Sequence, residues 1–437
     1  MITGRKPGRN AFRPLASRND RWQAGMLRAL AALLALTGTV ADAASTPAQT
    51  IHSLEVMHWL TSGRDAAALA VIRDRFVQQG GAWTETPMPG AGETGRAAAV
   101  NRIVGGRPPA VFQFSLGSQL SELAAANLIR TLPPAADWDA AIPPGIAAVS
   151  KYNGRILAVP VTIRGENWMF YNKALLLRLG IGVPKTWAEF MTSAQRLRAA
   201  GVVPLALGGQ SWQERLLFNA VLLGVGGTTF YRRVYEQLDG KAIDSDLMLK
   251  VFETFGALRP YVDAGSPGRR WNQTTRMVIH GEAAFQIMGD WAKGEVAAAG
   301  VTLGSAVDCA LAPANESAYI MMVDGFALAA TDDASLRAAQ DLFVRTVREP
   351  GVQVELAQRL GSIPVRIDVP STSFDACSAH AMRIARDPAS QLMDPGLSLS
   401  GGLSGAIDDS ISQFWNQKTL TAEQGRTLLR QTIQAYR

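Results

Sequence analysis

The chain has 437 residues, of which 47 % are hydrophobic and 18 % charged, and two are cysteines. This composition is typical of a globular protein of two or three domains, and it excludes a disordered chain, a collagen and a disulfide scaffold. The net charge of +6 would suggest a nucleic-acid partner, but seven basic and two acidic residues fall in residues 1–43. The rest of the chain is nearly neutral, so we expect no nucleic-acid partner.

Residues 1–43 have the pattern of a secretory signal peptide. The apolar run Ala29–Val40 follows the basic residues and precedes Ala41-Asp42-Ala43, a small-x-small cleavage pattern. This run is shorter than the roughly 20 residues that span a membrane. Met26 is an alternative start that leaves the same mature chain. We therefore predict export to the periplasm with cleavage of the leader.

After the leader, strand and helix patterns alternate. In chain order they predict a strand at Leu54–Leu60, a helix at Asp65–Gln78, a strand at Pro108–Phe114, a helix at Gln119–Leu128, a loop at Pro133–Pro144 and a strand at Ile156–Val161. Such alternation favours a parallel-rich α/β sheet covered by helices. Ligands of these sheets bind beyond the carboxyl ends of the strands, so we expect the turn from Trp59 to Asp65, with Thr61-Ser62-Gly63, to line a binding site.

A second, mainly helical unit begins after Pro160. Asn172 starts a helix that ends near Gly180, and Thr186 caps the next helix with Glu189 three residues on. The remaining predicted elements are helices at Gln213–Leu223, Tyr231–Leu238 and Asp246–Val262, a strand at Ala283–Met288, and short apolar connectors at Gly325–Ala330 and Ser362–Val365.

The two cysteines, Cys309 and Cys377, lie 68 residues apart. In an oxidising compartment an even pair more often forms one disulfide than two free thiols. A redox-active pair would be expected to have the C-x-x-C spacing, which is absent. We therefore predict a structural disulfide.

Motifs of catalysis are absent from the sequence. The four histidines are scattered without H-E-x-x-H spacing, and no G-x-S-x-G elbow, G-x-G-x-x-G turn after the first strand or Walker A loop is present. We expect no enzyme activity, no metal and no cofactor. Tryptophans are more informative, because their faces stack on the C–H faces of sugar rings. We expect Trp168 and Trp291 in the core, while Trp59 and Trp271 fit a core or a binding role equally well.

Several ordered motifs resemble family 1 extracellular solute-binding proteins of ABC importers, and most closely the periplasmic glucose/mannose-binding branch. These motifs are His58-Trp59 with Thr61-Ser62-Gly63, Asn167-Trp168-Met169 with Tyr171-Asn172-Lys173, Gly208-Gly209-Gln210, Arg269-Arg270-Trp271-Asn272, Met288-Gly289-Asp290-Trp291, and Asp375-Ala376-Cys377. The resemblance spans nearly the whole mature chain, and the cysteine pair resembles the disulfide of that branch.

This resemblance implies an α/β, two-lobed periplasmic-binding-protein fold of type II, with the ligand between lobes that three hinge crossovers join. We expect residues 44–160 and about 325–362 to form the N-terminal lobe, and about 161–324 and 363–437 the C-terminal lobe. The implied partners are a sugar or sugar-like ligand and an ABC permease in the inner membrane, with the binding protein itself a monomer.

Carried over residue by residue, the resemblance implies a sugar site that is only partly retained. Trp59 and Trp271 match stacking tryptophans, Asp324 matches a hydroxyl-binding aspartate, and Asp65 stands where the branch has Glu. Gln113, in the second predicted strand, is a further ligand-binding candidate.

Other positions of the implied site are apolar here. Leu60 replaces a second Trp, Met322 an Asn and Leu360 a Lys, while Leu399 falls near a His of the branch. Each buried polar partner left unmade costs about 1 to 3 kcal/mol, so we expect weak glucose binding and a less polar or larger ligand. Two other readings remain open at this point: a sensor that presents itself to a membrane kinase without transport, and a secreted enzyme on the same fold, which the missing catalytic motifs disfavour.

Overall fold

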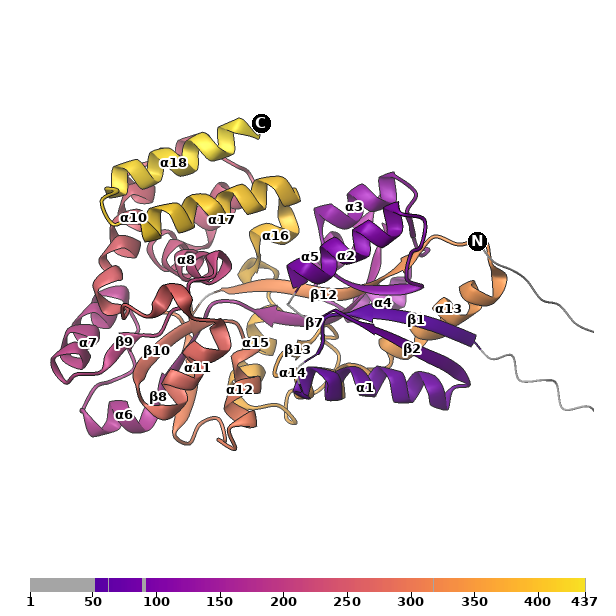
Figure 1. Cartoon of the computed structure of the whole chain (residues 1–437), viewed down its shortest axis with the longest axis horizontal. Coiled ribbons are helices and arrows are strands. Elements are labelled where there is room, and N and C mark those ends of the chain that lie inside the picture. The colour runs from indigo at the N-terminus through magenta and orange to yellow at the C-terminus, as the bar shows by residue number, and fades with distance from the viewer. Residues whose placement is uncertain (1–51, 62, 89–91, 317, 437) are drawn as a thin grey trace, which may run out of the picture. The chain divides into compact units, whose positions relative to one another are not determined.

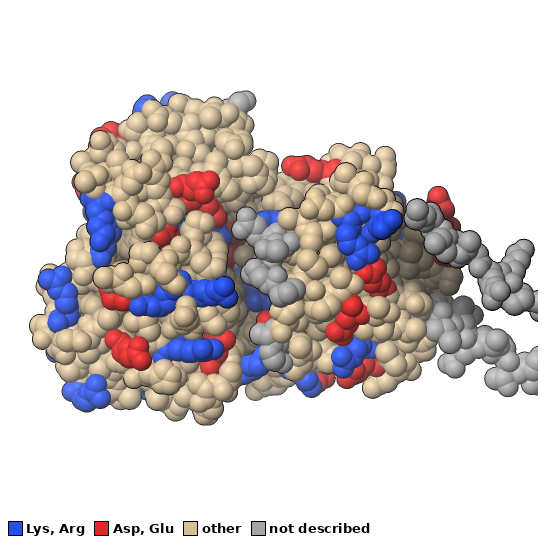
Figure 2. Space-filling view, viewed as in Figure 1, with Lys and Arg blue, Asp and Glu red and all other residues tan. Residues whose placement is uncertain are grey.

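A computed structural model describes residues 52–61, 63–88, 92–316 and 318–436 (Figure 1). The predicted signal peptide, residues 1–43, lies outside the described residues. In the part of the chain that is described, no helix is both long enough and apolar enough to cross a bilayer. Lys, Arg, Asp and Glu are interspersed on the face drawn in Figure 2, and no single sign of charge dominates it.

The larger of two main sheets has eight strands. They are β1 (His52–His58), β2 (Gly81–Pro87), β3 (Val111–Ser115), β4 (Ile129–Arg130), β7 (Ala158–Gly165), β12 (Tyr319–Ala329), β13 (Ile363–Pro364) and β14 (Gln391–Met393). The order is β13-β7-β12-β3-β1-β2, and β4 and β14 also pair with β12. The long strand β12 thus lies at the centre of the sheet, beside β7 (Figure 1).

The expectation of a parallel-rich sheet is wrong, because β12 runs antiparallel to β3, β4 and β7. Only β1 with β2 and β3, and β12 with β14, are parallel pairs of this sheet among the described residues. Parallel neighbours need a crossover helix, which α1 and α2 supply between β1, β2 and β3. No such helix precedes β12, because the chain enters it directly from β11 of the smaller sheet. β12 therefore runs in the opposite direction to β3 and β7.

Helices pack around the larger sheet. They are α1 (Gly63–Gln78), α2 (Gly92–Val104), α3 (Ser118–Ala125), α4 (Ala136–Ala141), α5 (Pro144–Val149), α13 (Ala334–Arg348), α14 (Pro350–Leu360), α15 (Ala376–Ala385) and α16 (Pro395–Ser398), with a small hairpin of β5 (Lys151–Tyr152) and β6 (Arg155–Ile156). Buried side chains of this region, among them Phe76, Phe112 and Phe343, form one hydrophobic cluster, which we call the large-sheet cluster.

The smaller sheet has the order β11-β8-β10-β9. Its strands are β8 (Trp168–Asn172), β9 (Val203–Leu205), β10 (Ala283–Met288) and β11 (Val307–Leu311), and its helices are α6 (Lys173–Arg178), α7 (Trp187–Ala199), α8 (Ser211–Tyr235), α9 (Gly240–Ile243), α10 (Asp246–Ala257), α11 (Trp271–His280), α12 (Ala292–Ala298), α17 (Gly401–Asn416) and α18 (Ala422–Ala435). Short 3₁₀ turns η1 (Arg259–Tyr261), η2 (Ser266–Gly268) and η3 (Pro388–Ser390) complete the described elements.

The yellow helices α17 and α18 pack beside α8 and α10 (Figure 1), where the rings of Phe252 and Phe414 lie 5.0 Å apart between centroids. This second group of buried side chains is the small-sheet cluster.

Most predicted elements are confirmed, with shifted ends. The strand at Ala283–Met288 has the predicted bounds, and Asn172 and Thr186 cap α6 and α7 by accepting from the backbone N–H three residues on. The loop predicted at Pro133–Pro144 is wrong in part, since it contains α4, whose Trp138 is 3 % exposed. The tryptophan anchors this short helix in the core, a tertiary effect that its Pro- and Ala-rich sequence conceals.

The two helices predicted at Gln213–Leu223 and Tyr231–Leu238 are parts of α8. They are separated by a kink at Gly227, whose φ of 75° is left-handed and interrupts the helical geometry.

Within the described residues, the chain passes between the two sheets at three places: from β7 to β8, from β11 to β12, and from β14 to α16 and α17. Asn167 joins the first two passages, because its Nδ2 donates to the Ala318 carbonyl (3.0 Å) and its Oδ1 accepts from Ile320 N (3.0 Å). The buried Arg215 pairs with Glu166 of the first passage (3.2 Å) and with Asp394 of the third. The passages are therefore tied to one another by buried polar side chains.

A disulfide joins Cys309 of β11 to Cys377 at the start of α15, which confirms the predicted pairing. The structure also places β13 and β14 in the larger sheet, although the sequence analysis assigns 363–437 to the C-terminal lobe. Sheet membership alone does not divide the chain into lobes, and the lobe boundaries stay a prediction.

Candidate functional site

Trp59 directly follows the carboxyl end of β1, and Gln113 is the middle residue of the neighbouring parallel strand β3. The backbone N of Trp59 donates to Gln113 Oε1 at 3.1 Å. The half-buried ring of Trp59 packs against Gly95 of α2, where an added Cβ would approach Trp59 Cε3 to 2.8 Å. The glycine thus leaves room for the ring, and the side chain of Gln113 holds the backbone that carries it.

A set of polar side chains shares one face of the larger sheet. Asp324 of β12 stands opposite Ser115 on β3 and opposite Thr162 on β7. Arg164 is two residues beyond Thr162 and stands opposite Met322. Side chains alternate along a strand and opposed residues share a face. The four polar residues and Met322 therefore point to the same side of the sheet.

Arg164 and Asp324 form a nearly buried ion pair. Arg164 Nε lies 2.7 Å from Asp324 Oδ2, and the two side chains are 11 % and 4 % exposed. Burial lowers the pKa of Arg164, but Asp324, Asp65 and Asp290 together raise it above its usual value. Burial raises the pKa of Asp324 in spite of Arg164 and of a hydrogen bond with Ser115. Asp65, half-buried in the first turn of α1, therefore belongs to the same electrostatic cluster.

Asp290 follows β10, and a hydrogen bond of its side chain links this end of β10 to the end of β7. Its Oδ2 accepts from Gly165 N at 3.0 Å, while its Oδ1 is buried and has no hydrogen-bond partner among the described residues. Burial raises the pKa of Asp290 to about 7, opposed by the charges of Lys293 and Arg164. This carboxyl group is thus partly protonated near neutral pH.

Three tryptophans mark the starts of three helices of the smaller sheet. Trp212 lies in the first turn of α8, Trp271 is the first residue of α11, and Trp291 precedes α12. The rings of Trp212 and Trp291 lie 6.0 Å apart, and Trp271 N donates to Gln210 Oε1 at 3.2 Å. All three are half-buried against the large-sheet cluster, whereas Trp168 is a core residue, 1 % exposed.

The apolar residues of the predicted site differ in how deeply they are buried and in the cluster to which they belong. Leu60 and Leu360 are buried in the large-sheet cluster and Leu399 in the small-sheet cluster, while Met322 is half-buried beside Arg164. Their role as ligand contacts stays a prediction.

The structure places Asp65, Asp324, Trp59 and Gln113 in or next to the larger sheet, and Trp271 at the start of α11, linked to Gln210 before α8. Arg164, Thr162 and Asp290 were not among the predicted ligand-binding residues. One signal was available for Arg164: it is the one charged residue of the strand Ala158–Gly165.

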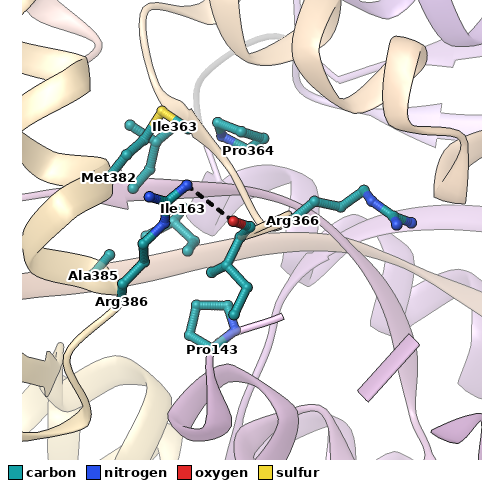
Figure 3. A pocket seen from close by; sticks show the side chains of 9 residues that line it. Pro143, Ile163, Ile363, Pro364, Arg366, Met382, Ala385 and Arg386 are labelled. Atoms are coloured by element: carbon teal, nitrogen blue, oxygen red, sulfur yellow. Dashed lines mark hydrogen bonds between the residues drawn. The ribbon is translucent and has the colours of Figure 1, made fainter. Parts of the chain in front are cut away.

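A shallow pocket lies on the opposite face of β7, to which Ile163 points (Figure 3). It is lined by apolar residues such as Ile363 and Met382, and Arg386 there donates to the Ile367 carbonyl at 3.0 Å. This pocket is separate from the face that carries Arg164. Asp308 lies near Cys309 and Cys377, but the disulfide leaves no thiolate to bind a metal.

Solved structures with the same fold are two-lobed binding proteins. A chitin oligosaccharide binding protein covers 88 % of this chain and 98 % of its own, with a TM-score of 0.74 and 18 % identity. The two sheets, the three passages between them and this likeness define a periplasmic-binding-protein fold.

Sequence comparison gives the family. Residues 62–339 match the family model "Bacterial extracellular solute-binding protein". A "Probable sugar-binding periplasmic protein" of Mesorhizobium japonicum is 34 % identical over 93 % of this chain and 99 % of its own length. An "ABC transporter extracellular-binding protein" of Pyrococcus horikoshii, described as uncharacterized, is 28 % identical over 76 % of this chain and 75 % of its own.

The chain belongs to the bacterial extracellular solute-binding protein family. It is a periplasmic binding protein, not an enzyme, because the family and its relatives bind solutes.

Proposed function

We propose that this protein is the sugar-binding component of an ABC importer and delivers its ligand to a permease of the inner membrane. The observation that carries the proposal is the Arg164–Asp324 ion pair on β7 and β12, in the same sheet whose strand β1 leads into Trp59. Charged hydrogen-bonding side chains and an aromatic face suit a sugar, which has apolar C–H faces and a rim of hydroxyls. The family and the names of the relatives at 34 % identity support the same function.

We propose further that the site is an altered form of the glucose/mannose type. Trp59, Trp271, Asp65, Asp324 and Gln113 supply stacking and hydroxyl contacts. The side chains of Leu60, Met322 and Leu360 provide no hydrogen bonds, and apolar residues at these positions support a site with fewer polar contacts. The ligand is accordingly less polar than glucose or larger, and glucose itself binds weakly.

The test is a thermal-shift screen of the protein produced from the full chain, against monosaccharides, disaccharides and small aromatic glycosides. A ligand that binds only the native state raises the melting temperature. We expect at least one sugar or sugar-like compound to raise it. No response to any of them would contradict a sugar-binding function, and glucose as the strongest responder would contradict the altered site.

Trp59→Ala is the variant that links the response to this site. Loss of the stacking face should weaken binding by about tenfold or more. The matched control is Trp83→Ala, because Trp83 lies in β2 against Phe76 and Phe343, away from the ends of β1 and β3. The control should lower the melting temperature of the free protein and leave the affinity for the sugar unchanged.

A further inference from the structure

A polar group on one face of the larger sheet, and one oxygen of the Asp290 carboxyl group at the end of β7, are buried without hydrogen-bond partners. In the part of the chain that the structure describes, Thr162 Oγ1 and Asp290 Oδ1 have no partner, and these two residues are 0 % and 1 % exposed. Arg164 Nε lies 2.7 Å from Asp324 Oδ2 on the same face as Thr162. A buried polar group without a partner is costly, so native proteins seldom tolerate several together. Their concentration here points to a ligand that completes them.

The charges around Arg164 define what kind of ligand fits. Asp324 and Asp65 act on this one guanidinium, as does Asp290 to the extent that it is ionised, so its positive charge is more than compensated. Lys293, the next cation, is already held by Asp375 at 3.2 Å and by Ser378. A ligand carboxylate would therefore meet excess negative charge and gain no free cation.

The face of the larger sheet that carries Arg164 and Asp324 offers both hydrogen-bond donors and acceptors. A guanidinium only donates, and an ionised carboxylate only accepts. A sugar hydroxyl does both, so one hydroxyl of a neutral sugar can donate to Asp324 or Asp65 while its oxygen accepts from Arg164.

We propose that Arg164 is a specificity-determining residue of the sugar site, which donates to an oxygen of a neutral sugar and, with its three carboxylates, excludes sugar acids. The inference rests on the proposed sugar-binding function and names the ligand class within it. On the facing strand β12, the residue opposite Arg164 is the half-buried Met322, whose side chain has no hydrogen-bond donor. Arg164 therefore supplies the donors at this position of the sheet.

The experiment is calorimetry with three matched sets that share stereochemistry and differ in charge. They are glucose, glucuronate and glucosamine; galactose, galacturonate and galactosamine; and mannose, mannuronate and mannosamine. We expect the neutral member of at least one set to bind about tenfold or more tightly than its acid. An acid or an amino sugar that binds more tightly than the neutral sugar would overturn the inference and leave the sugar-binding function standing.

Arg164→Met then tests the residue itself. It removes the donors at similar length, and we expect about a tenfold or greater loss of affinity for the neutral sugar, with partial recovery in Arg164→Lys. Arg233→Met is the control, since Arg233 is bound to Asp239 at 2.7 Å on the outside of α8 and should leave the affinity unchanged.

Arg164→Met also leaves Asp324 without its partner and can weaken folding. The double variant Arg164→Met/Asp324→Thr removes both charges, and its folding is followed by circular dichroism. Unchanged affinity and unchanged discrimination against the acid in Arg164→Met would mean that Arg164 only supports Asp324, and the same result in the double variant would mean that neither residue contacts the sugar. Either result would overturn the inference. If the unmodified protein binds no sugar of these sets and none of the thermal-shift screen, the proposed function fails first and the inference with it.

Discussion

Asp290 illustrates how burial alone changes the chemistry of one residue. Its carboxyl group is 1 % exposed, and burial raises its pKa to about 7 although Lys293 and Arg164 oppose the rise. Glu214 of α8 behaves in the same way, since burial raises its pKa to about 7 against hydrogen bonds from Ser412 and Asn416. In both cases the folded state holds a proton that the unfolded chain releases at lower pH.

A pH dependence of stability follows from these two residues. A raised pKa in the folded state means that the native protein binds more protons than the unfolded chain between about pH 4 and 7, so stability falls as pH rises through 7. Each group contributes roughly 1 kcal/mol less at pH 8 than at pH 6.5. The lowered pKa values of His58 and His380 oppose this change, because unfolded histidines are still about half protonated at pH 6.5, but each by at most about 0.4 kcal/mol. We expect urea denaturation to show lower stability at pH 8 than at pH 6.5.

Asp290→Asn and Glu214→Gln separate the two contributions. Each variant keeps an acceptor oxygen but cannot titrate, so each should flatten the decline by about 1 kcal/mol. Variants that decline as steeply as the unmodified protein would show that these carboxyl groups are not the source.

At the scale of elements, the helix caps are encoded locally. Thr186 Oγ1 accepts from Glu189 N at 3.1 Å, and Glu189 Oε2 accepts from Lys185 N at 2.8 Å. Both bonds satisfy backbone N–H groups at the start of α7 and involve only residues within four positions. This is why the start of this helix is predictable from sequence.

Removing the cap should destabilise the protein modestly. We expect Thr186→Ala to lower the free energy of unfolding by about 1 kcal/mol, measured by urea denaturation. Thr192→Ala in the same helix is the control, because the exposed Thr192 hydroxyl bonds only to the Ala188 carbonyl within the helix. A loss in the control equal to that in Thr186→Ala would contradict a capping role.

At the scale of the whole molecule, the passages between the sheets are held by long-range polar contacts. Glu166, Asp394 and Asp408 surround Arg215, and burial raises the pKa of Asp408 to about 6 against the charge of Arg215. The disulfide adds a covalent link between β11 of the smaller sheet and α15, whose Cys377 belongs to the large-sheet cluster.

Loss of that disulfide should destabilise the molecule more than loss of a helix cap. Closing a loop of 68 residues is worth about 4 kcal/mol in the chain-entropy model. We expect Cys309→Ser/Cys377→Ser to melt at a lower temperature than the oxidised protein, and dithiothreitol to lower the melting temperature of the unmodified protein only. Equal melting temperatures in all these samples would contradict a stabilising role.

Prediction from sequence succeeded where neighbours along the chain decide the structure. The cap at Thr186 and the strand Ala283–Met288 are of this kind. The cysteine pairing was predicted instead from the oxidising compartment and from the presence of two cysteines in the sequence. It failed for α4, whose buried Trp138 depends on Arg348 and Arg366 from distant segments that lie over its ring. Trp59, Asp65 and Asp324 were named as site residues through resemblance, and their role in binding stays a prediction.

Sequence alone therefore determined the local elements and the exported family, and it predicted several residues of the candidate site. Only the tertiary structure decided the direction of β12 and the pairing of Arg164 with Asp324. The physical reason is register: which residues of two strands stand opposite each other depends on how segments far apart in the chain align. Burial, which sets the pKa of Asp290 and leaves Thr162 without a partner, likewise arises only when those segments pack together.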